Sequence, residues 1–137
     1  MIKKSAKNIQ TAQAPAEYFT GETWIDFLVK NENIKCNVGK VSFCPGARNY
    51  WHTHPAGQVL IVTGGKGYVQ KKGEPIQLIL PGDVVIILPG EEHWHGATPE
   101  SLFTHIAIQL HNEKGEDINW LKEVTDAEYN SFGPVAP

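Results

Sequence analysis

Seven short runs of strand-like residues, each followed by a turn, most constrain the fold of this chain. Apolar and β-branched side chains are frequent in residues 22–30, 34–43, 58–63, 67–72, 76–80, 84–88 and 102–110. Segments rich in glycine and proline separate these runs, for example Cys44-Pro45-Gly46, Pro81-Gly82-Asp83 and Pro89-Gly90. Many short strands joined by tight turns are typical of antiparallel sandwiches and barrels. The sequence therefore predicts an all-β protein with a single domain.

The two ends of the chain carry weaker signals. The polar segment 1–20 is expected to be a flexible N-terminal lead-in, which leaves residues 21–137 as the domain. Near the C-terminus, Thr125 is followed three residues later by Glu128, which is a capping box and predicts a short helix. Residues 118–124 are expected to add a turn of helix that packs on the barrel.

The amino-acid composition limits the kinds of partner that the protein is expected to bind. The 12 basic and 15 acidic side chains give a formal net charge of −3, and the basic residues form no dense cluster. Nucleic-acid binding requires a clustered positive surface, so it is not expected. There is no apolar stretch long enough to span a membrane and no apolar leader, so a cytoplasmic location is expected. The two cysteines, Cys36 and Cys44, are expected to be buried or nearly buried thiols rather than a disulfide framework.

Two His-x-His pairs are the strongest chemical signal. His52 and His54 form the first pair, and His93 and His95 form the second, each beside a Gly/Pro turn. Alternate residues of a strand share a face, so each pair can present two imidazoles to one point. A single histidine in a sheet is most often structural. Four in this arrangement favour metal binding, because imidazole is the commonest metal ligand.

The spacing around the first pair resembles the first motif of the cupins, G-x5-H-x-H-x3,4-E-x6-G. The corresponding residues are Gly46, His52, His54, Gln58 and Gly65, and Gln58 takes the place of the usual glutamate. A second motif, G-x5-P-x-G-x2-H-x3-N, is matched more loosely by residues Gly82, Pro89, Gly90, His93 and Ala97. The resemblance implies a double-stranded β-helix, or jelly-roll barrel. It also implies that a divalent metal is bound by His52, His54, Gln58 and His93.

Further phrases, including Trp51-His-Thr-His-Pro55, Gly57-Gln58 and His93-Trp-His-Gly-Ala97, resemble one subgroup of cupins. It comprises small bacterial proteins of the carboxymuconolactone decarboxylase-associated type, and it includes manganese-dependent hydroxynitrile lyases. The resemblance implies a lyase that acts on cyanohydrins or related hydroxy and carbonyl compounds. Manganese is the metal expected first, with iron, nickel, cobalt, copper and zinc as alternatives.

Residues beside the expected ligands are candidates for catalysis and substrate binding. His95 shares a face with His93, so it is either a fifth ligand or a base. In the run 102–110, His105 shares a face with Phe103, Ala107 and Gln109, and the resemblance implies that it moves a proton. An ordinary hydrogen-bonded histidine remains the alternative for His105. An apolar pocket beside the metal is expected to be lined by Phe43, Leu60, Val62 and Phe103.

Other functions share the same ligands. A dioxygenase or another oxidoreductase that uses iron, nickel or copper is one alternative, although many such cupins use glutamate where this chain has Gln58. A binding protein with a closed metal shell, which recognises a small molecule without converting it, is another. The expected assembly is a homodimer, in which the strand around Trp24 exchanges with the second copy and so covers an exposed edge.

Overall fold

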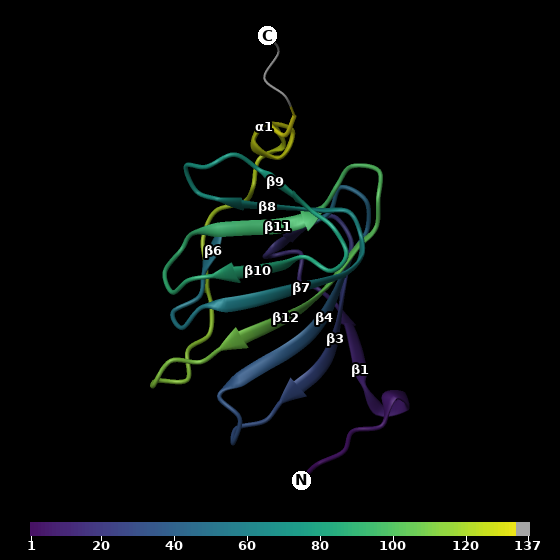
Figure 1. The fold of residues 1–137 in the computed structure, drawn as a ribbon, viewed down its shortest axis with the longest axis vertical. Helices are drawn as coiled ribbons and strands as arrows, with labels where there is room; N and C mark the ends of the chain where they lie inside the picture. The colour runs from purple at the N-terminus through teal and green to yellow at the C-terminus, as the bar shows by residue number, and fades with distance from the viewer. Residues whose placement is uncertain (134–137) are drawn as a thin grey trace.

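The computed structural model describes residues 1–133, in which two antiparallel sheets carry the larger of two hydrophobic clusters. One sheet has the order β1-β3-β4-β12-β7-β10, which runs from β1 at the lower right of Figure 1 up to β10. These strands span Gln10–Gln13 (β1), Thr23–Lys30 (β3), Cys36–Phe43 (β4), Phe103–Leu110 (β12), Gln58–Gly65 (β7) and Val84–Ile87 (β10). Residues 134–137, the end of the expected domain, lie outside the described part of the chain.

The second sheet has the order β13-β6-β11-β5-β2, and β8 joins it by pairing with both β11 and β9. Its strands are mostly short because glycine and proline turns interrupt the chain often. They span Asn119–Trp120 (β13), His52–Thr53 (β6), His93–Ala97 (β11), Arg48–Asn49 (β5), Phe19–Thr20 (β2), Gly67–Lys71 (β8) and Gln77–Ile79 (β9). The predicted all-β class and jelly-roll barrel are confirmed.

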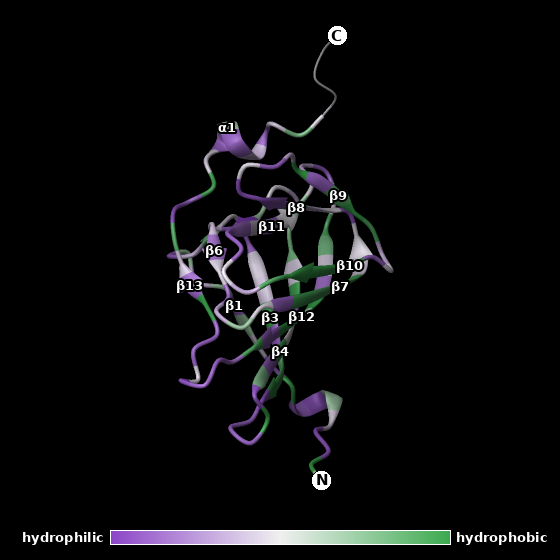
Figure 2. Ribbon diagram, turned by 60° about the vertical axis from the view of Figure 1, so that its left-hand side comes forward, coloured by the Kyte–Doolittle hydropathy of each residue, from purple (hydrophilic) through white to green (hydrophobic). Residues whose placement is uncertain are grey.

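Strand β12 shows how the sequence pattern produces the core. Phe103, His105 and Ala107 are buried between the sheets, whereas Thr104 and Ile106 on the opposite face are only half-buried. The face assignment made from the sequence is therefore correct. Buried side chains of both sheets form one cluster: Phe19, Val41, Phe43, Ala47, Leu60, Val62, Val69, Ile79, Ile87, Ala97, Phe103 and Ala107. Figure 2 shows the hydrophobic colour concentrated on β7, β10 and β12.

The C-terminal segment closes one end of the molecule. Helix α1 (Asp126–Tyr129) begins at Thr125, whose side chain and that of Glu128 form the predicted capping box. Arg48 donates to the carboxylate of Asp126 and to the carbonyl of Val124, and its guanidinium lies over the ring of Tyr129. These contacts hold the helix above β8 and β9, as Figure 1 shows.

Two expectations about the ends differ from the structure. Residues 118–124 contain no helical turn, because Asn119 and Trp120 form β13 and pair with Thr53 and His52 of β6. The segment 1–20, expected as a flexible lead-in, contains a 3-10 helix (Ala6–Asn8), strand β1 and strand β2. Strand β1 pairs along its whole length with β3, so backbone hydrogen bonds order a segment whose polar side chains gave no strand signal.

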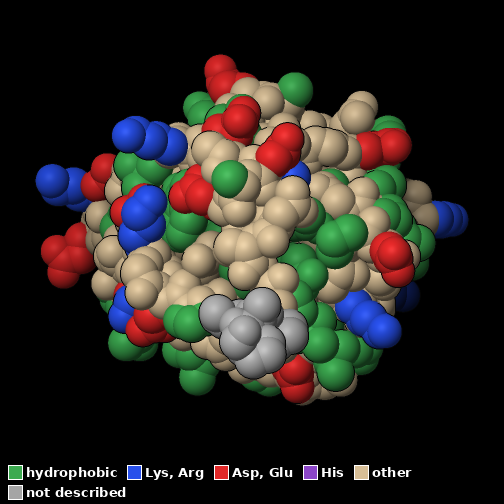
Figure 3. Space-filling model, turned by 90° about the horizontal axis from the view of Figure 1, so that it is seen from above, with side chains coloured by type: hydrophobic (Ala, Val, Ile, Leu, Met, Phe, Trp, Pro, Cys, Tyr) green, Lys and Arg blue, Asp and Glu red, His purple; other side chains and the backbone are tan. Residues whose placement is uncertain are grey.

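The surface agrees with the balanced composition. Lysine, arginine and acidic side chains are interspersed on the face seen in Figure 3. Among the described residues, no helix is both long and apolar enough to cross a membrane. Cys36 and Cys44 are free thiols, and both are half-buried, close to the expectation.

Candidate metal centre

Three histidines are oriented by backbone carbonyl groups. The Nδ1 atoms of His52, His93 and His54 lie 2.7 Å, 3.0 Å and 2.7 Å from the carbonyl oxygens of Tyr50, Glu91 and Asp117. A carbonyl oxygen only accepts, so each Nδ1 carries the hydrogen and each Nε2 keeps its lone pair. Histidine ligands of metals are commonly fixed in this way by a partner on the second ring nitrogen.

The fold brings the three rings together. His52 and His93 are direct partners across β6 and β11, and their ring centroids are 4.2 Å apart. The ring of His54, just beyond β6, is 4.9 Å from that of His52 and 5.3 Å from that of His93. Gln58 opens β7 in the opposite sheet, with its Oε1 3.3 Å from Nε2 of His93. The structure thus brings together the four side chains that the motif predicts as ligands.

The chemistry of this donor set fits a divalent metal. The Nε2 atom of His54 is buried and has no hydrogen-bond partner among the described residues. Burial, together with the neighbouring His93 and His54, holds the pKa of His52 well below its usual value. Burial also lowers the pKa of His93 to about 4. Several neutral imidazoles with converging lone pairs are stabilised by a cation, which supplies the partner that the protein does not.

His95 joins the same cluster from β11. One ring nitrogen from each of His52, His93 and His95 lies within 4.8 Å of the other two, which makes this a compact possible metal group. His95 therefore stands close enough to the other imidazoles for either of its expected roles, ligand or base.

His95 also contacts two buried polar residues on its other side. Its Nδ1 is 3.0 Å from Nε2 of His105, and the amide nitrogen of Asn49 lies 3.2 Å and 3.3 Å from the two ring nitrogens of His95. Asn49 also accepts a hydrogen bond from the backbone of His95. Burial lowers the pKa of His105 to about 3, and that of His95 also falls well below its usual value. Sequence reasoning missed Asn49, because an asparagine between turns usually signals only a loop.

An apolar cavity of about 340 Å³ opens onto these residues. Its polar lining includes His52, Gln58, His95 and His105. Its remaining wall comes from both sheets and from residues near the N-terminus: Pro15, Tyr18, Phe19, Ile25, Phe27, Asn37, Gly39, Val41, Phe43, Asn49, Ala107, Gln109, Ile118 and Trp120. Such a cavity, apolar with a few convergent polar groups, is typical of small-molecule sites.

The cavity wall differs in part from the expected pocket. Phe43 lines it, but Leu60, Val62 and Phe103 are almost fully buried in the core and do not. Tyr18 and Trp120 supply wall that the sequence did not indicate, and their rings stack at 4.6 Å. They come from the two segments whose structure was expected to be a flexible lead-in and a helical turn. The alternation of residues along a strand identifies which side chains point inward. It does not tell whether an inward side chain packs in the core or lines a cavity.

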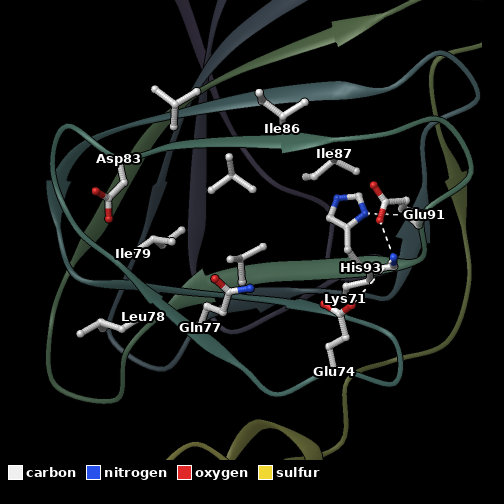
Figure 4. Close-up of a pocket in the computed structure, with 13 residues that line it drawn as sticks. Lys71, Glu74, Gln77, Leu78, Ile79, Asp83, Ile86, Ile87, Glu91 and His93 are labelled. Atoms are coloured by element: carbon white, nitrogen blue, oxygen red, sulfur yellow. Dashed lines mark hydrogen bonds and ion pairs between the residues drawn. The ribbon is translucent and has the colours of Figure 1, made fainter.

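A second cavity, of about 430 Å³, lies between β10 and the pair β8 and β9. Figure 4 shows His93 at one end of it and isoleucines along its upper wall. Lys71 reaches Glu91 at 2.9 Å and Glu74 at 4.0 Å, so the charged groups on this side are paired. His93 thus lines this cavity and also belongs to the histidine cluster.

Comparison with known proteins identifies the family. The family model for the cupin domain matches residues 39–104. The chain is also 47% identical over 120 residues to an (R)-mandelonitrile lyase of Granulicella tundricola, a match that covers 87% of this chain and 91% of that protein. The chain is a cupin.

Similar solved structures agree with this assignment. A cupin-like protein of Thermotoga maritima is 43% identical, with a TM-score of 0.82 over 86% of this cupin and 90% of that chain. A polyketide cyclase of Streptomyces resistomycificus has a TM-score of 0.74 at 13% identity, over 94% and 90% of the two chains. At such low identity the second match shows the shared fold alone.

Proposed function

We propose that this cupin is a metal-dependent lyase that cleaves or forms cyanohydrins. The observation that carries the proposal is the buried His95–His105 pair, which lies beside the converging imidazoles at the polar end of an apolar cavity. The 47% identity to an (R)-mandelonitrile lyase supports the same reaction class. His52, His54, Gln58 and His93 would hold the metal, and manganese is the ion we propose first.

Gln58 gives this donor set its particular character. An amide oxygen carries no charge, so four neutral ligands leave the positive charge of a divalent ion uncompensated. When bound, such an ion supplies a Lewis acid that stabilises an anion or a developing oxyanion. A glutamate at this position would reduce that charge by one. The neutral set therefore favours chemistry in which an anion such as cyanide or an alkoxide forms.

The residues around the cavity can carry out the proton transfers of cyanohydrin cleavage. The hydroxyl proton of the substrate passes to the His95–His105 pair while the O–H electrons form the C=O bond. The C–CN bond breaks, and its electron pair leaves with cyanide. Return of the proton from the histidine pair gives hydrogen cyanide beside the aldehyde. Burial lowers the pKa of both imidazoles, so both are neutral at pH 7 and each keeps a lone pair on one ring nitrogen.

The cavity wall favours an apolar substrate. Phe19, Phe27, Phe43 and Trp120 present aromatic surface to the space beside the histidines. An aromatic aldehyde and its cyanohydrin combine a flat apolar ring with a single carbon that carries the polar groups. The ring matches the aromatic part of the wall, and the polar groups match the histidines.

We further propose that two copies associate through the outer face of the first sheet. Ile61 on β7 is 37% exposed, and Val84 and Ile86 on β10 are 58% and 69% exposed. Strand β10 is also an edge of that sheet. An exposed apolar edge is usually covered by a partner. Analytical ultracentrifugation that shows a monomer at micromolar concentration would exclude this assembly.

The function is tested by measuring metal and reaction together. The protein is purified without a metal-binding tag, analysed for its metals, loaded with Mn²⁺ and assayed for benzaldehyde release from mandelonitrile. The His52→Ala/His54→Ala double variant is treated identically, and Mn²⁺ in buffer is the blank. About one metal per chain and activity, both lost in a folded variant, is the expected result. Bound metal without cleavage would refute the lyase and favour oxidation or ligand binding on the same site.

A further inference from the structure

His54 depends on a distant part of the chain, unlike the other two oriented histidines. His52 and His93 donate from Nδ1 to carbonyls only two residues earlier, so their rings are held locally. His54 donates to the carbonyl of Asp117, which is 63 positions later in the sequence. The backbone carbonyl of His54 is itself fixed by Gly57 and Gly90. The ring orientation of His54 is therefore determined by where residue 117 lies.

The side chain of Asp117 fixes that location. Its Oδ2 accepts hydrogen bonds from the amide of Asn37 at 2.8 Å and from the amide of Gln109 at 3.2 Å. Asn37 and Gln109 are direct partners across β4 and β12, so the carboxylate bridges two strands of the first sheet. Gln109 in turn is the partner of Gln58 across β12 and β7. One residue thus connects the sheet that carries Gln58 to the ring of His54.

The segments on either side of Asp117 are also held in place. Residues 112–116 form a turn held by Asn112, which bonds the backbone and the carboxylate of Glu116. After Asp117 the chain enters β13, where Trp120 pairs with His52. The segment therefore reaches the histidine cluster at His54 and at His52, and Asp117 lies where it crosses from one sheet to the other.

We propose that Asp117 is a positioning residue that orients His54 for metal binding by tying its own segment to Asn37 and Gln109. The inference rests on the metal site of the proposed function, but not on the reaction. One oxygen shared by two amides ties residue 117 to both strands, and its removal leaves both donors unpaired. Loss of a residue that orients a ligand commonly weakens metal binding about 10–100-fold.

The test compares three variants of the full-length protein by metal affinity. Asp117→Leu removes the acceptor, Asp117→Asn keeps one oxygen that both amides can share, and Glu113→Leu places the same leucine at an exposed position of the preceding turn. Mn²⁺ affinity is measured by chelator competition, and the visible spectrum of the Co²⁺-loaded protein reports the ligand set. We expect Asp117→Leu to weaken Mn²⁺ binding about 10–100-fold and to give a Co²⁺ spectrum like that of His54→Ala. We expect Asp117→Asn and Glu113→Leu to remain close to wild type.

Several results would overturn the inference. It fails if Asp117→Leu binds Mn²⁺ as tightly as wild type. It also fails if Asp117→Asn is as weak as Asp117→Leu, since the charge and not the acceptor would then matter. If Asp117→Leu does not fold, Asn37→Leu removes one donor and must weaken Mn²⁺ binding in its place. A wild-type protein that binds metal without cleaving cyanohydrins would refute the reaction and leave this inference standing, because its measured quantity is metal affinity.

Discussion

The Nε2 atom of His105 lies 3.0 Å from Nδ1 of His95, and both rings are fully enclosed between the two sheets. One ring comes from β11 and the other from β12, so the pair links opposite walls of the barrel. A proton accepted at one imidazole can pass to the other through this contact. Among the described residues, this contact is also the only side-chain hydrogen-bond contact between His105 and the histidine cluster.

The first prediction separates proton transfer from metal binding. His105→Leu should lower kcat for mandelonitrile cleavage about 10²–10³-fold, because the proton loses its second acceptor. The metal content should not change, since His105 is not one of the proposed ligands His52, His54, Gln58 and His93. Metal analysis and steady-state kinetics on the same sample check both statements.

The companion variant, His95→Ala, decides the role of His95. We expect the same loss of kcat with the metal retained, as for a base. A variant that loses its metal would instead make His95 a ligand, and the proton transfer would then have to be assigned to His105 alone.

The second prediction concerns the charge of the donor set. Gln58→Glu changes the group near Nε2 of His93 from a neutral amide to a carboxylate of the same size. Because a carboxylate offsets one positive charge, we expect tighter Mn²⁺ binding and slower cyanohydrin cleavage. Gln77→Glu, on the exposed strand β9, is the matched control and should change neither quantity. Faster cleavage by Gln58→Glu would contradict the electrostatic argument.

The third prediction is that the metal-free protein loses stability in mild acid. Burial lowers the folded-state pKa of His93 to about 4 and that of His105 to about 3, whereas an unfolded histidine titrates near 6.5. Below pH 6.5 the unfolded chain therefore binds protons that the folded chain does not. The free energy of unfolding consequently decreases as the pH is lowered. The free energy of unfolding has its full value above about pH 7, and each such histidine lowers it by about 2 kcal/mol by pH 5.

Urea unfolding of the metal-free protein at pH 7.5 and pH 5.0 measures this loss. His105→Leu removes one of the contributing groups, so its stability should depend less steeply on pH than that of wild type. Equal slopes for the two proteins would show that His105 does not contribute.

The sequence predicted the fold, and it predicted four side chains that the structure brings close together, because both depend on short-range patterns. Glycine and proline turns separate the strands, and the spacing of His52, His54, Gln58 and His93 places these residues on two facing sheets. The capping box at Thr125 is equally local, and the structure confirms it. Such features need only the period of a strand or the geometry of one turn.

What the sequence missed depends on contacts between distant segments. Strand β1 is polar and is ordered by backbone pairing with β3, which no side-chain pattern reports. Trp120 was expected in a helical turn, but it pairs with His52, because β6 offers an open edge at that point. The contact of Asp117 with His54 spans 63 positions and uses a backbone carbonyl, which any residue could supply.

The last prediction tests why the first cupin motif ends in glycine. Gly65 has φ +71°, and a Cβ there would overlap the backbone carbonyl of Leu102. Gly65→Ala would therefore combine a strained backbone with a clash that only movement of β12 can relieve, and we expect a loss of at least about 2 kcal/mol in the free energy of unfolding. Gly64→Ala is the matched control, because its φ is not positive and its nearest neighbour is the Cβ of Thr104 at 3.9 Å. Urea unfolding of both variants at pH 7.5 makes the comparison. Equal free energies of unfolding for the two variants would mean that the backbone near residue 65 moves without cost to relieve the clash. Backbone geometry would then not explain why the motif has glycine at this position.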